Sequence, residues 1–535
     1  MKIKPKIAII GWDSASLNII QPLLESSALP NLSKLIEKGR WGILTSTLHP
    51  ISPTAWSSFM TGMNPGKHGI FDFVGFNERK QLHFSNGSTL KARTLWSYLK
   101  QFKSLVVNVP MTYPPEPING MVISGMDSPY HDRIYTFPHH LSDKIHSNYP
   151  DYVTEIPVKK VPWLPQDKFL DKYIQKLCDL VYIQSSIVCD LLLENSFDFL
   201  NIVFTAPDRI QHALGHKINT VNPNDGIGQI YVACDQALGK ILESLNDDWT
   251  VIVISDHGAQ PYNQVFELSS WLEQTGLLKF NKINKCDIVK KYSQKIIWQF
   301  NKHFTDKEPQ KTIKSVFWDR INWDQTTVIC LGAFGSIYLN SKQRFTNGIV
   351  EENEAEDICR ALTQSLINFK DPLTNKSVIK AIHRGKDIYK GPYTKIAPDL
   401  VVETNDDYFI RNNISHLESK VIYRAGIYPN RSLPHTGKHS REGIYIVSGP
   451  EITPEKTLGK ANIVDIAPTV LYRFGLPIND QMDGHPRLDW FTPEFTHLNP
   501  LEWKSYEDDV NHSNKDYSAD ENTQITNRLK DLGYL

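Results

Sequence analysis

Short runs of consecutive apolar residues recur along the chain and predict strands that are buried on both faces. They occupy residues 6–11 (KIAIIG), 198–205 (DFLNIVFT), 249–255 (WTVIVIS) and 443–448 (GIYIVS). None shows the polar and apolar alternation of a half-exposed strand, and each is shorter than an ordinary buried helix. The pattern therefore predicts a sheet that is covered on both sides.

Segments with apolar residues at helical spacing follow these runs. Residues 26–39 end at a glycine, residues 226–245 connect the second run to the third, and residues 462–475 end at another glycine. A strand, a helix and a strand in this order form a parallel crossover unit. The predicted fold class is therefore α/β, with helices around a mostly parallel central sheet.

The length of 535 residues is too great for one ordinary core and predicts a large α/β domain with an insertion. Residues 261–326 are rich in Lys, Gln and Asn with helical patches, and 327–405 contain the strand-like stretches GSIYLN and APDLVVE. We expect residues 1–260 to form the first part of the core, 261–400 an inserted cap, 401–500 the remainder of the core, and 501–535 a polar tail with a short C-terminal helix.

Charge and cysteine usage narrow the class of protein. Lys and Arg total 58 against 59 Asp and Glu, so the chain lacks the basic excess of a nucleic-acid surface. The six cysteines form no CxxC pair and fit reduced thiols in the cytoplasm. No signal peptide and no apolar stretch of transmembrane length is found. We expect a cytoplasmic protein without a membrane span; the sequence does not indicate its oligomeric state.

Three aspartates share one setting, because each follows one of the predicted strands: Asp13 the first, Asp208 the second and Asp256 the third. Ligands of an open parallel sheet bind outside the carboxyl ends of its strands, so these side chains are expected at one rim. A single aspartate at such a place is usually a turn former or a helix N-cap. Whether these aspartates are metal ligands depends on which other potential ligands lie near them in the sequence.

Two histidines accompany the aspartates. His212 lies four residues after Asp208, on the same face of a helix if this segment is helical, and His257 directly follows Asp256. A lone helical histidine is usually structural, but two Asp and His pairs behind two buried strands are hard to explain as unrelated caps. Carboxylate and imidazole donors without thiolates suit Zn²⁺ or Mn²⁺.

A candidate nucleophile lies in residues 51–62, ISPTAWSSFMTG. Pro53 can occupy the first turn of a helix, which would place Ser52 at the N-cap, where backbone N–H groups and the helix dipole favour an oxyanion or a phosphate. Taken alone, Ser52 is more simply a helix cap. A hydroxyl nucleophile also needs activation, which metal coordination supplies.

Two further histidines, His435 and His439, lie in the loop PHTGKHSREG just before the strand at 443–448. Either could complete a metal site, although histidines in such loops are also common on surfaces.

Seven stretches together resemble the alkaline phosphatase superfamily. Within it the chain resembles the type I phosphodiesterase/nucleotide pyrophosphatase group, and more closely bacterial proteins described as predicted phosphohydrolases or phosphomutases. In matching order and spacing over nearly the whole chain, the stretches are GWDSAS, SPTAWSSFMTGMNPGKHGIFDF, NVPMTYPPEPINGMVISGM, APDRIQHALGH, VISDHGAQ, HTGKHSREGIYIVSGP and NIVDIAPTVLYRFGLP. The resemblance implies an alkaline-phosphatase-like sandwich of helices around a mostly parallel sheet, with an inserted lid or cap.

The resemblance also implies two divalent metal ions, with Zn²⁺ expected and Mn²⁺ as the alternative. It assigns Asp208, His212 and His439 to one ion, and Asp13, Ser52, Asp256 and His257 to the other. The family nucleophile lies nine residues before the Thr of a Thr-Gly pair, here Thr61, which indicates Ser52; Thr54 is the alternative if the helix start is shifted. His435 has no family counterpart and ranks below His439.

Two departures bear on the substrate. Nucleotide pyrophosphatases have an Asn three residues after the nucleophile, where this chain has Ala55, so a nucleotide substrate is not implied. Sulfatases of the superfamily have a Cys/Ser-x-Pro-x-Arg motif, whereas Pro53 directly follows Ser52 here and Trp56 stands in place of the Arg. A formylglycine sulfatase is therefore disfavoured.

The implied reaction has two steps, in which Ser52 attacks phosphorus in line and the resulting seryl phosphate is hydrolysed. We expect small phosphodiesters as substrates, because Ala55 and Trp56 provide no cation for a monoester dianion and residues 261–326 could shape a pocket for a second ester group. Arg209 and Lys67 could instead reach the phosphate. A phosphotransferase, a phosphomutase or a phosphomonoesterase on the same site is the main alternative, and a non-catalytic metal-binding protein is a further one.

Overall fold

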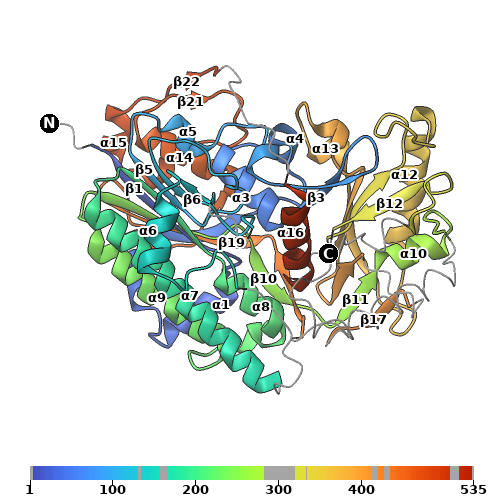
Figure 1. Ribbon diagram of the computed structural model, residues 1–535, viewed down its shortest axis with the longest axis horizontal. Helices are drawn as coiled ribbons and strands as arrows, with labels where there is room; N and C mark the ends of the chain where they lie inside the picture. Colours follow the sequence, from blue (N-terminus) through green and yellow to red (C-terminus); the bar gives the residue numbers. More distant parts are fainter. Residues whose placement is uncertain are drawn as a thin grey trace, which may run out of the picture.

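Nine strands form the central sheet, in the order β20–β2–β19–β9–β1–β8–β5–β6–β7 (Figure 1). The computed structural model describes residues 4–129, 134–156, 166–281, 320–332, 334–412, 420–426, 434–506 and 517–532. The strands are β1 (Lys6–Trp12), β2 (Arg40–Thr45), β5 (Ser104–Val107), β6 (Gly120–Ile123), β7 (Thr136–Phe137), β8 (Phe199–Phe204), β9 (Trp249–Ile254), β19 (Glu442–Ser448) and β20 (Gly459–Asn462). The four predicted buried runs are thus β1, β8, β9 and β19.

The sheet is mostly parallel, as predicted. The pairs β1/β8, β1/β9, β5/β8, β5/β6 and β2/β20 are parallel. Strand β19 runs antiparallel to both β9 and β2, and β7 runs antiparallel to β6. Because β8, β1 and β9 are neighbours and point the same way, their carboxyl ends form one continuous stretch of the rim.

Helices cover both faces of this sheet. One layer contains α1 (Leu17–Glu25), α2 (Pro30–Lys38), α7 (Gln166–Glu194), α8 (Ala206–Leu214) and α9 (Gly226–Ser244), and the other contains α3 (Ser52–Thr61), α5 (Leu95–Tyr98) and α14 (Ile466–Arg473). Strand β1 shows why both layers are needed: Ala8 and Ile10 pack into the first core, and Ile7 and Ile9 into the second. Each such buried side chain contributes about 1.5–3 kcal/mol.

Two smaller sheets lie between residues 264 and 424. One joins β11 (Gln264–Glu267), β16 (Tyr408–Arg411) and β17 (Ile422–Arg424), and the other joins β12 (Val328–Leu331), β13 (Ser336–Leu339), β15 (Leu400–Thr404) and β14 (Ile379–Arg384). Helices α10 (Leu268–Gln274), α12 (Glu352–Ile367) and α13 (Gly385–Ile388) belong to the same region. The stretches GSIYLN and APDLVVE are strands as expected, but strands of this region continue past 400, because β16 and β17 pair with β11. Much of 261–326 lies outside the described residues.

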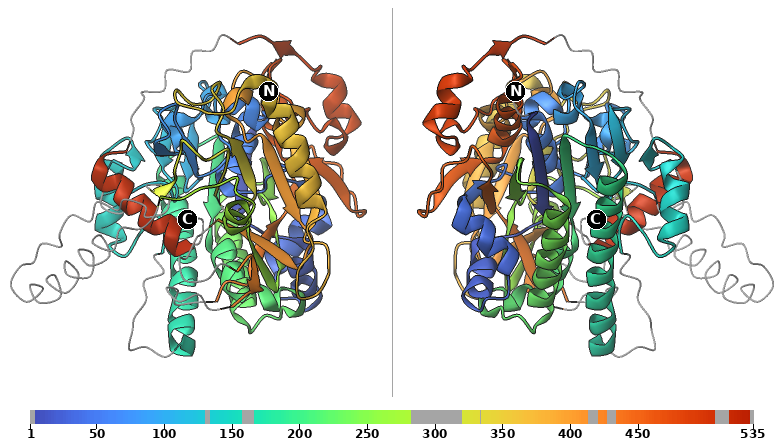
Figure 2. Two further views of the ribbon diagram at one scale, coloured as in Figure 1. Left: turned by 90° about the vertical axis from the view of Figure 1, so that its right-hand side faces the viewer. Right: turned by 90° about the vertical axis from the view of Figure 1, so that its left-hand side faces the viewer.

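The remaining elements are short or peripheral. They are α4 (Pro65–His68), α6 (Leu141–Asn148), α15 (Pro493–Leu498), α16 (Ala519–Leu532), β3 (Val74–Phe76) with β4 (Leu82–Phe84), β10 (Gly258–Pro261) with β18 (Gly437–Ser440), β21 (Ile478–Asn479) with β22 (Trp503–Lys504), and the 3₁₀ helices Gly87–Thr89, Gly215–Thr220, Thr394–Ile396, Ile463–Asp465 and Leu488–Trp490. Helix α16 is the helix expected near the C-terminus, and Figure 2 shows it at the periphery. No helix in the described ranges is long and apolar enough to cross a membrane.

Candidate metal centre

The three predicted aspartates lie together at the carboxyl ends of β8, β1 and β9. Asp13 directly follows β1, Asp256 lies just beyond the end of β9, and Asp208 lies in the first turn of α8, which follows β8. Each side chain is at most 1% exposed. Backbone geometry fixes the turn after β1, because Ser14 has a φ of 65° and its N–H donates to Asp256 Oδ1 at 3.2 Å.

Asp208, His212 and His439 form the first group of potential metal ligands. Asp208 Oδ1 lies 3.3 Å from His212 Nε2 and 3.1 Å from His439 Nε2, and the two imidazole nitrogens are 3.1 Å apart. His212 comes from α8 at the predicted i,i+4 spacing, and His439 from β18. The two elements come this close because Gly437 has no side chain: a Cβ there would lie 2.1 Å from Gln211 O.

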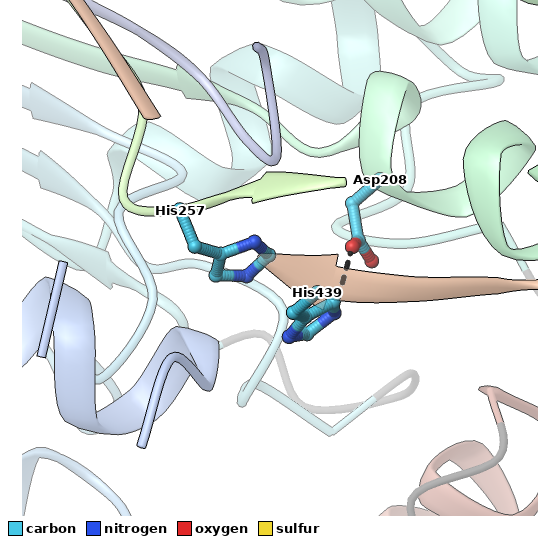
Figure 3. Close-up of side chains that lie close together, drawn as sticks. All are labelled: Asp208, His257 and His439. Atoms are coloured by element: carbon cyan, nitrogen blue, oxygen red, sulfur yellow. Dashed lines mark ion pairs between the residues drawn. The ribbon is translucent and has the colours of Figure 1, made fainter. Parts of the chain in front are cut away.

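Asp13, Ser52, Asp256 and His257 form the second group. His257 Nε2 lies 3.2 Å from Asp256 Oδ2, 3.7 Å from Asp13 Oδ1 and 3.4 Å from Ser52 Oγ. His257 also adjoins the first group, because its ring stacks on that of His439 with centroids 3.7 Å apart. One ligand atom each from Asp208, His257 and His439 lie within 4.8 Å of one another (Figure 3). The two groups therefore form one continuous cluster.

The three imidazoles are oriented by backbone carbonyl groups. His212 Nδ1 lies 3.0 Å from Gly437 O, His257 Nδ1 lies 3.1 Å from Gly258 O, and His439 Nδ1 lies 2.7 Å from Pro50 O. A carbonyl oxygen can only accept, so Nδ1 carries the proton and Nε2 presents a lone pair to the cluster. This arrangement is typical of metal-binding histidines. Burial lowers the pKa of both His257 and His439, which keeps them neutral.

The geometry fits a divalent metal. Tetrahedral zinc with bonds of 2.0–2.1 Å places neighbouring ligand atoms about 3.3–3.4 Å apart, and the three ligand atoms of the first group lie 3.1–3.3 Å apart. These atoms are two imidazole lone pairs and a carboxylate oxygen, which repel one another unless a cation lies between them. In the second group the distances from His257 Nε2 are 3.2–3.7 Å.

The two carboxyl groups of the second group are held in an environment that favours their protonated form. Burial, opposed by the hydrogen bond from Ser14 N–H and assisted by the charge of Asp208, raises the pKa of Asp256 to about 7. Burial and the neighbouring Asp256 raise the pKa of Asp13 well above its usual range. A bound cation would reverse this effect.

Metal-free protein should therefore lose stability as pH rises through about 7. A carboxyl group whose pKa is higher in the folded than in the unfolded state stabilises the fold below its unfolded pKa, and this contribution disappears as pH rises through the folded value; each pKa unit is worth about 1.4 kcal/mol. The check is the Tm of chelator-treated protein from pH 5 to 8, compared with Asp256→Asn, which should flatten the decline. An identical pH profile for both proteins would show that Asp256 does not titrate as described.

Ser52 lies one position further into helix α3 than predicted. The N-cap is Ile51, which has an extended backbone, and Ser52 is the first helical residue, followed by Pro53. No side-chain capping hydrogen bond is made. The predicted N-cap role is therefore wrong, because the extended residue before the helix is Ile51, but Ser52 Oγ still lies beside His257 at the helix N-terminus.

Two alternative residues lie apart from this cluster of ligand atoms. Thr54 is fully buried in α3, and its Oγ1 makes no hydrogen bond within the described residues. His435 stacks on His212 with ring centroids 4.8 Å apart, and its Nδ1 lies 2.6 Å from the Tyr262 hydroxyl.

Trp56 has a role in the site that the sequence reasoning missed. Its indole N–H donates to Asp13 Oδ2 at 3.3 Å, so it orients that carboxylate and is not simply an apolar wall. The ring has room because a Cβ on Gly11 would lie 2.6 Å from Trp56 Cη2. The available signal was the spacing: Trp56 lies four residues after Ser52 and shares its helix face.

Arg209 and Lys67 are both engaged by carboxylates. Arg209 is buried and contacts Asp208 and Glu155, and Lys67 Nζ lies 2.7 Å from Asp483 Oδ1. Arg209 thus lacks the solvated position that charged side chains usually have, whereas Lys67 is partly exposed; both are held by protein carboxylates.

Comparison with known proteins agrees with this fold. Residues 7–435 match the sequence model of the type I phosphodiesterase / nucleotide pyrophosphatase family. Phosphonoacetate hydrolase from Sinorhizobium meliloti 1021, solved with phosphonoformate, is 14% identical with a TM-score of 0.54, over 88% of this chain and 95% of that one. A mutant of alkaline phosphatase PafA is 12% identical with a TM-score of 0.55, over 92% and 100%. Murine ectonucleotide pyrophosphatase/phosphodiesterase 5 is 12% identical with a TM-score of 0.48, over 91% and 100%. No curated protein matches the chain in sequence.

The central sheet and its helical layers thus have the same fold as alkaline phosphatase PafA. The family model covers most of the chain, and the chain therefore belongs to the type I phosphodiesterase/nucleotide pyrophosphatase family. Membership supports phosphoester hydrolysis as the class of reaction.

Proposed function

We propose that the protein hydrolyses phosphodiesters through a covalent seryl phosphate, using two divalent metal ions. The observation that carries this proposal is the position of Ser52 Oγ, 3.4 Å from His257 Nε2 within a buried cluster of three carboxylates and three imidazoles. A buried serine in such surroundings is activated as a nucleophile when the cluster holds cations.

Asp208, His212 and His439 would hold the first ion, and Asp13, Ser52, Asp256 and His257 the second. Nitrogen and oxygen donors in this number favour Zn²⁺, with Mn²⁺ as the alternative. When bound, two such ions lower the pKa of the serine hydroxyl and stabilise the charge that develops on the phosphoryl and leaving oxygens. The three buried carboxylates supply the negative charge that holds them.

Ser52 Oγ attacks phosphorus in line with the leaving oxygen. A bond forms between Oγ and phosphorus, the bond to the first alcohol breaks, and the alcohol leaves with a proton. Water then attacks the seryl phosphate, which restores the Ser52 hydroxyl and releases a phosphate monoester. The position of Ser52 in the first turn of α3 assists both steps, because free backbone N–H groups and the helix dipole favour negative charge there.

A cavity of about 700 Å³ beside His439 has room for the rest of the substrate. This volume is within the range of about 300–1,000 Å³ typical of small-molecule sites. Its walls include Phe334 and Phe409, and Phe334 stacks on the His439 ring with centroids 4.9 Å apart. Among the described residues, none from 261–326 lines it; the cap contributes Phe334 and residues between 380 and 410 instead.

Diesters are the proposed substrates because Arg209, the cation beside Asp208, is already paired with carboxylates. A monoester dianion has three non-bridging oxygens to stabilise, whereas a diester has two and a second organic group that needs space. Arg209 faces Asp208 and Glu155, and Ala55 is apolar. The cavity can accept the second organic group.

The test compares kcat/KM for bis-nitrophenyl phosphate and nitrophenyl phosphate with one metal-loaded preparation. The diester should be the better substrate. A monoester advantage of about tenfold, which corresponds to about 1.4 kcal/mol of transition-state stabilisation, would overturn the diester assignment. Activity on neither compound, with metals bound, would count against the hydrolase itself.

A further inference from the structure

Arg209 lies between a proposed metal ligand and a second carboxylate. Its Nη1 donates to Asp208 Oδ2 at 2.5 Å, and its Nε and Nη2 donate to Glu155 Oε2 at 3.2 and 2.8 Å. The three side chains are at most 1% exposed. Glu155 is 54 residues away in sequence, so this contact is made by the fold.

The two oxygens of the Asp208 carboxylate therefore face different partners. Oδ2 faces Arg209, while Oδ1 faces His212 Nε2 and His439 Nε2. An aspartate carboxyl group rotates readily unless one oxygen is anchored. The guanidinium group is a rigid fork, and with Glu155 holding its other edge it fixes the rotation that presents Oδ1 to the metal position.

The charges in this group are compatible with the same role. One guanidinium cation faces two carboxylates, so Asp208 and Glu155 together keep a net negative charge in the presence of Arg209. Asp208 therefore remains attractive to a metal cation. A lysine would supply the charge without the planar fork.

The C-terminal helix contacts the segment that packs against Arg209. Its Nη2 lies 3.1 Å from Met126 Sδ. Arg528 of α16 donates from Nη1 to Met126 O and, at 2.6 Å, to Ser128 O. Just before this helix, the Tyr517 hydroxyl donates to Asp127 O at 2.7 Å. The segment 126–128 thus connects α16 to Arg209 across some 400 residues of sequence.

We propose that Arg209, held by Glu155, is a positioning residue for the first metal ion, and that the C-terminal helix supports it through residues 126–128. This inference rests on the proposed function. Outer contacts of this kind typically change metal affinity by about 10- to 100-fold when removed. The effect should be greatest at the first metal ion, because Asp13 is oriented by Trp56 and Asp256 by Ser14.

The experiment is a calorimetric Zn²⁺ titration of the chelator-treated, full-length protein. Arg209→Met should weaken one of two binding steps by about 10- to 100-fold and change the other much less. Arg209→Lys should be intermediate, and Arg528→Met should weaken the same step less. His212→Ala identifies the step as the first site. Arg487→Met is the matched control, because Arg487 pairs with Asp489 on the surface.

The titration separates two kinds of failure. A wild-type protein that binds no metal overturns the proposed function. Two wild-type steps that Arg209→Met and Glu155→Gln both leave unchanged overturn only the role of Arg209. If Arg209→Met fails to fold, Arg209→Lys and Glu155→Gln decide: selective weakening of the His212-dependent step supports the inference, and equal weakening of both steps contradicts it.

Discussion

Ser52→Ala should abolish turnover while leaving the fold intact. The expected loss in kcat is about 10³-fold or more, because no other group forms the bond to phosphorus in the proposed reaction. Stability should hardly change: Ser52 makes no capping bond, and alanine is favourable inside a helix. Steady-state kinetics with a phosphodiester and a thermal melt measure both effects. Mass spectrometry of acid-quenched wild-type enzyme should find the phosphoryl group, with its remaining ester substituent, on the peptide that contains Ser52.

Thr54→Ala is the matched control in the same helix. It removes a buried hydroxyl two residues away, which has no hydrogen bond in the described structure. Its kcat should stay within a few-fold of wild type. Near-normal activity in Ser52→Ala together with an inactive Thr54→Ala would show that the nucleophile is Thr54.

His212→Ala should remove one metal ion and nearly all activity, whereas His435→Ala should keep both ions. The two rings stack on each other and are both buried, so the substitutions make similar cavities. His212 presents Nε2 to Asp208 and His439, whereas His435 Nδ1 faces the Tyr262 hydroxyl. With two protein ligands left, the first site would bind its ion weakly.

Elemental analysis of both variants, purified side by side, measures the difference. Equal metal content in His212→Ala and His435→Ala would contradict the assignment of His212, and loss of an ion only in His435→Ala would exchange the two roles.

The pattern of apolar and polar residues predicted the strands and helices that depend on local sequence. The runs that became β1, β8 and β9 are apolar throughout because both faces are buried, and parallel pairing then required Asp13, Asp208 and Asp256 to share a rim. The spacing of Asp208 and His212 was sufficient to place both side chains on one side of α8.

Contacts between distant segments could not be predicted in this way. Glu155 reaches Arg209, and Arg528 reaches Met126, through packing that no local periodicity encodes. The cap strands β16 and β17 pair with β11 from far along the chain, so a boundary at residue 400 had no local signal against it. The start of α3 was misplaced by one residue, since proline is accepted at either of the first helical positions.

The central claim is a pair of divalent metal ions in the Asp and His cluster, and metal content tests it most directly. Protein purified without chelator, or reloaded with Zn²⁺ or Mn²⁺ and desalted, should contain two ions per chain by elemental analysis. The Asp256→Asn and His212→Ala variants should each contain about one, because each removes a ligand from a different site. A wild-type content of zero after reloading with either metal would contradict the account.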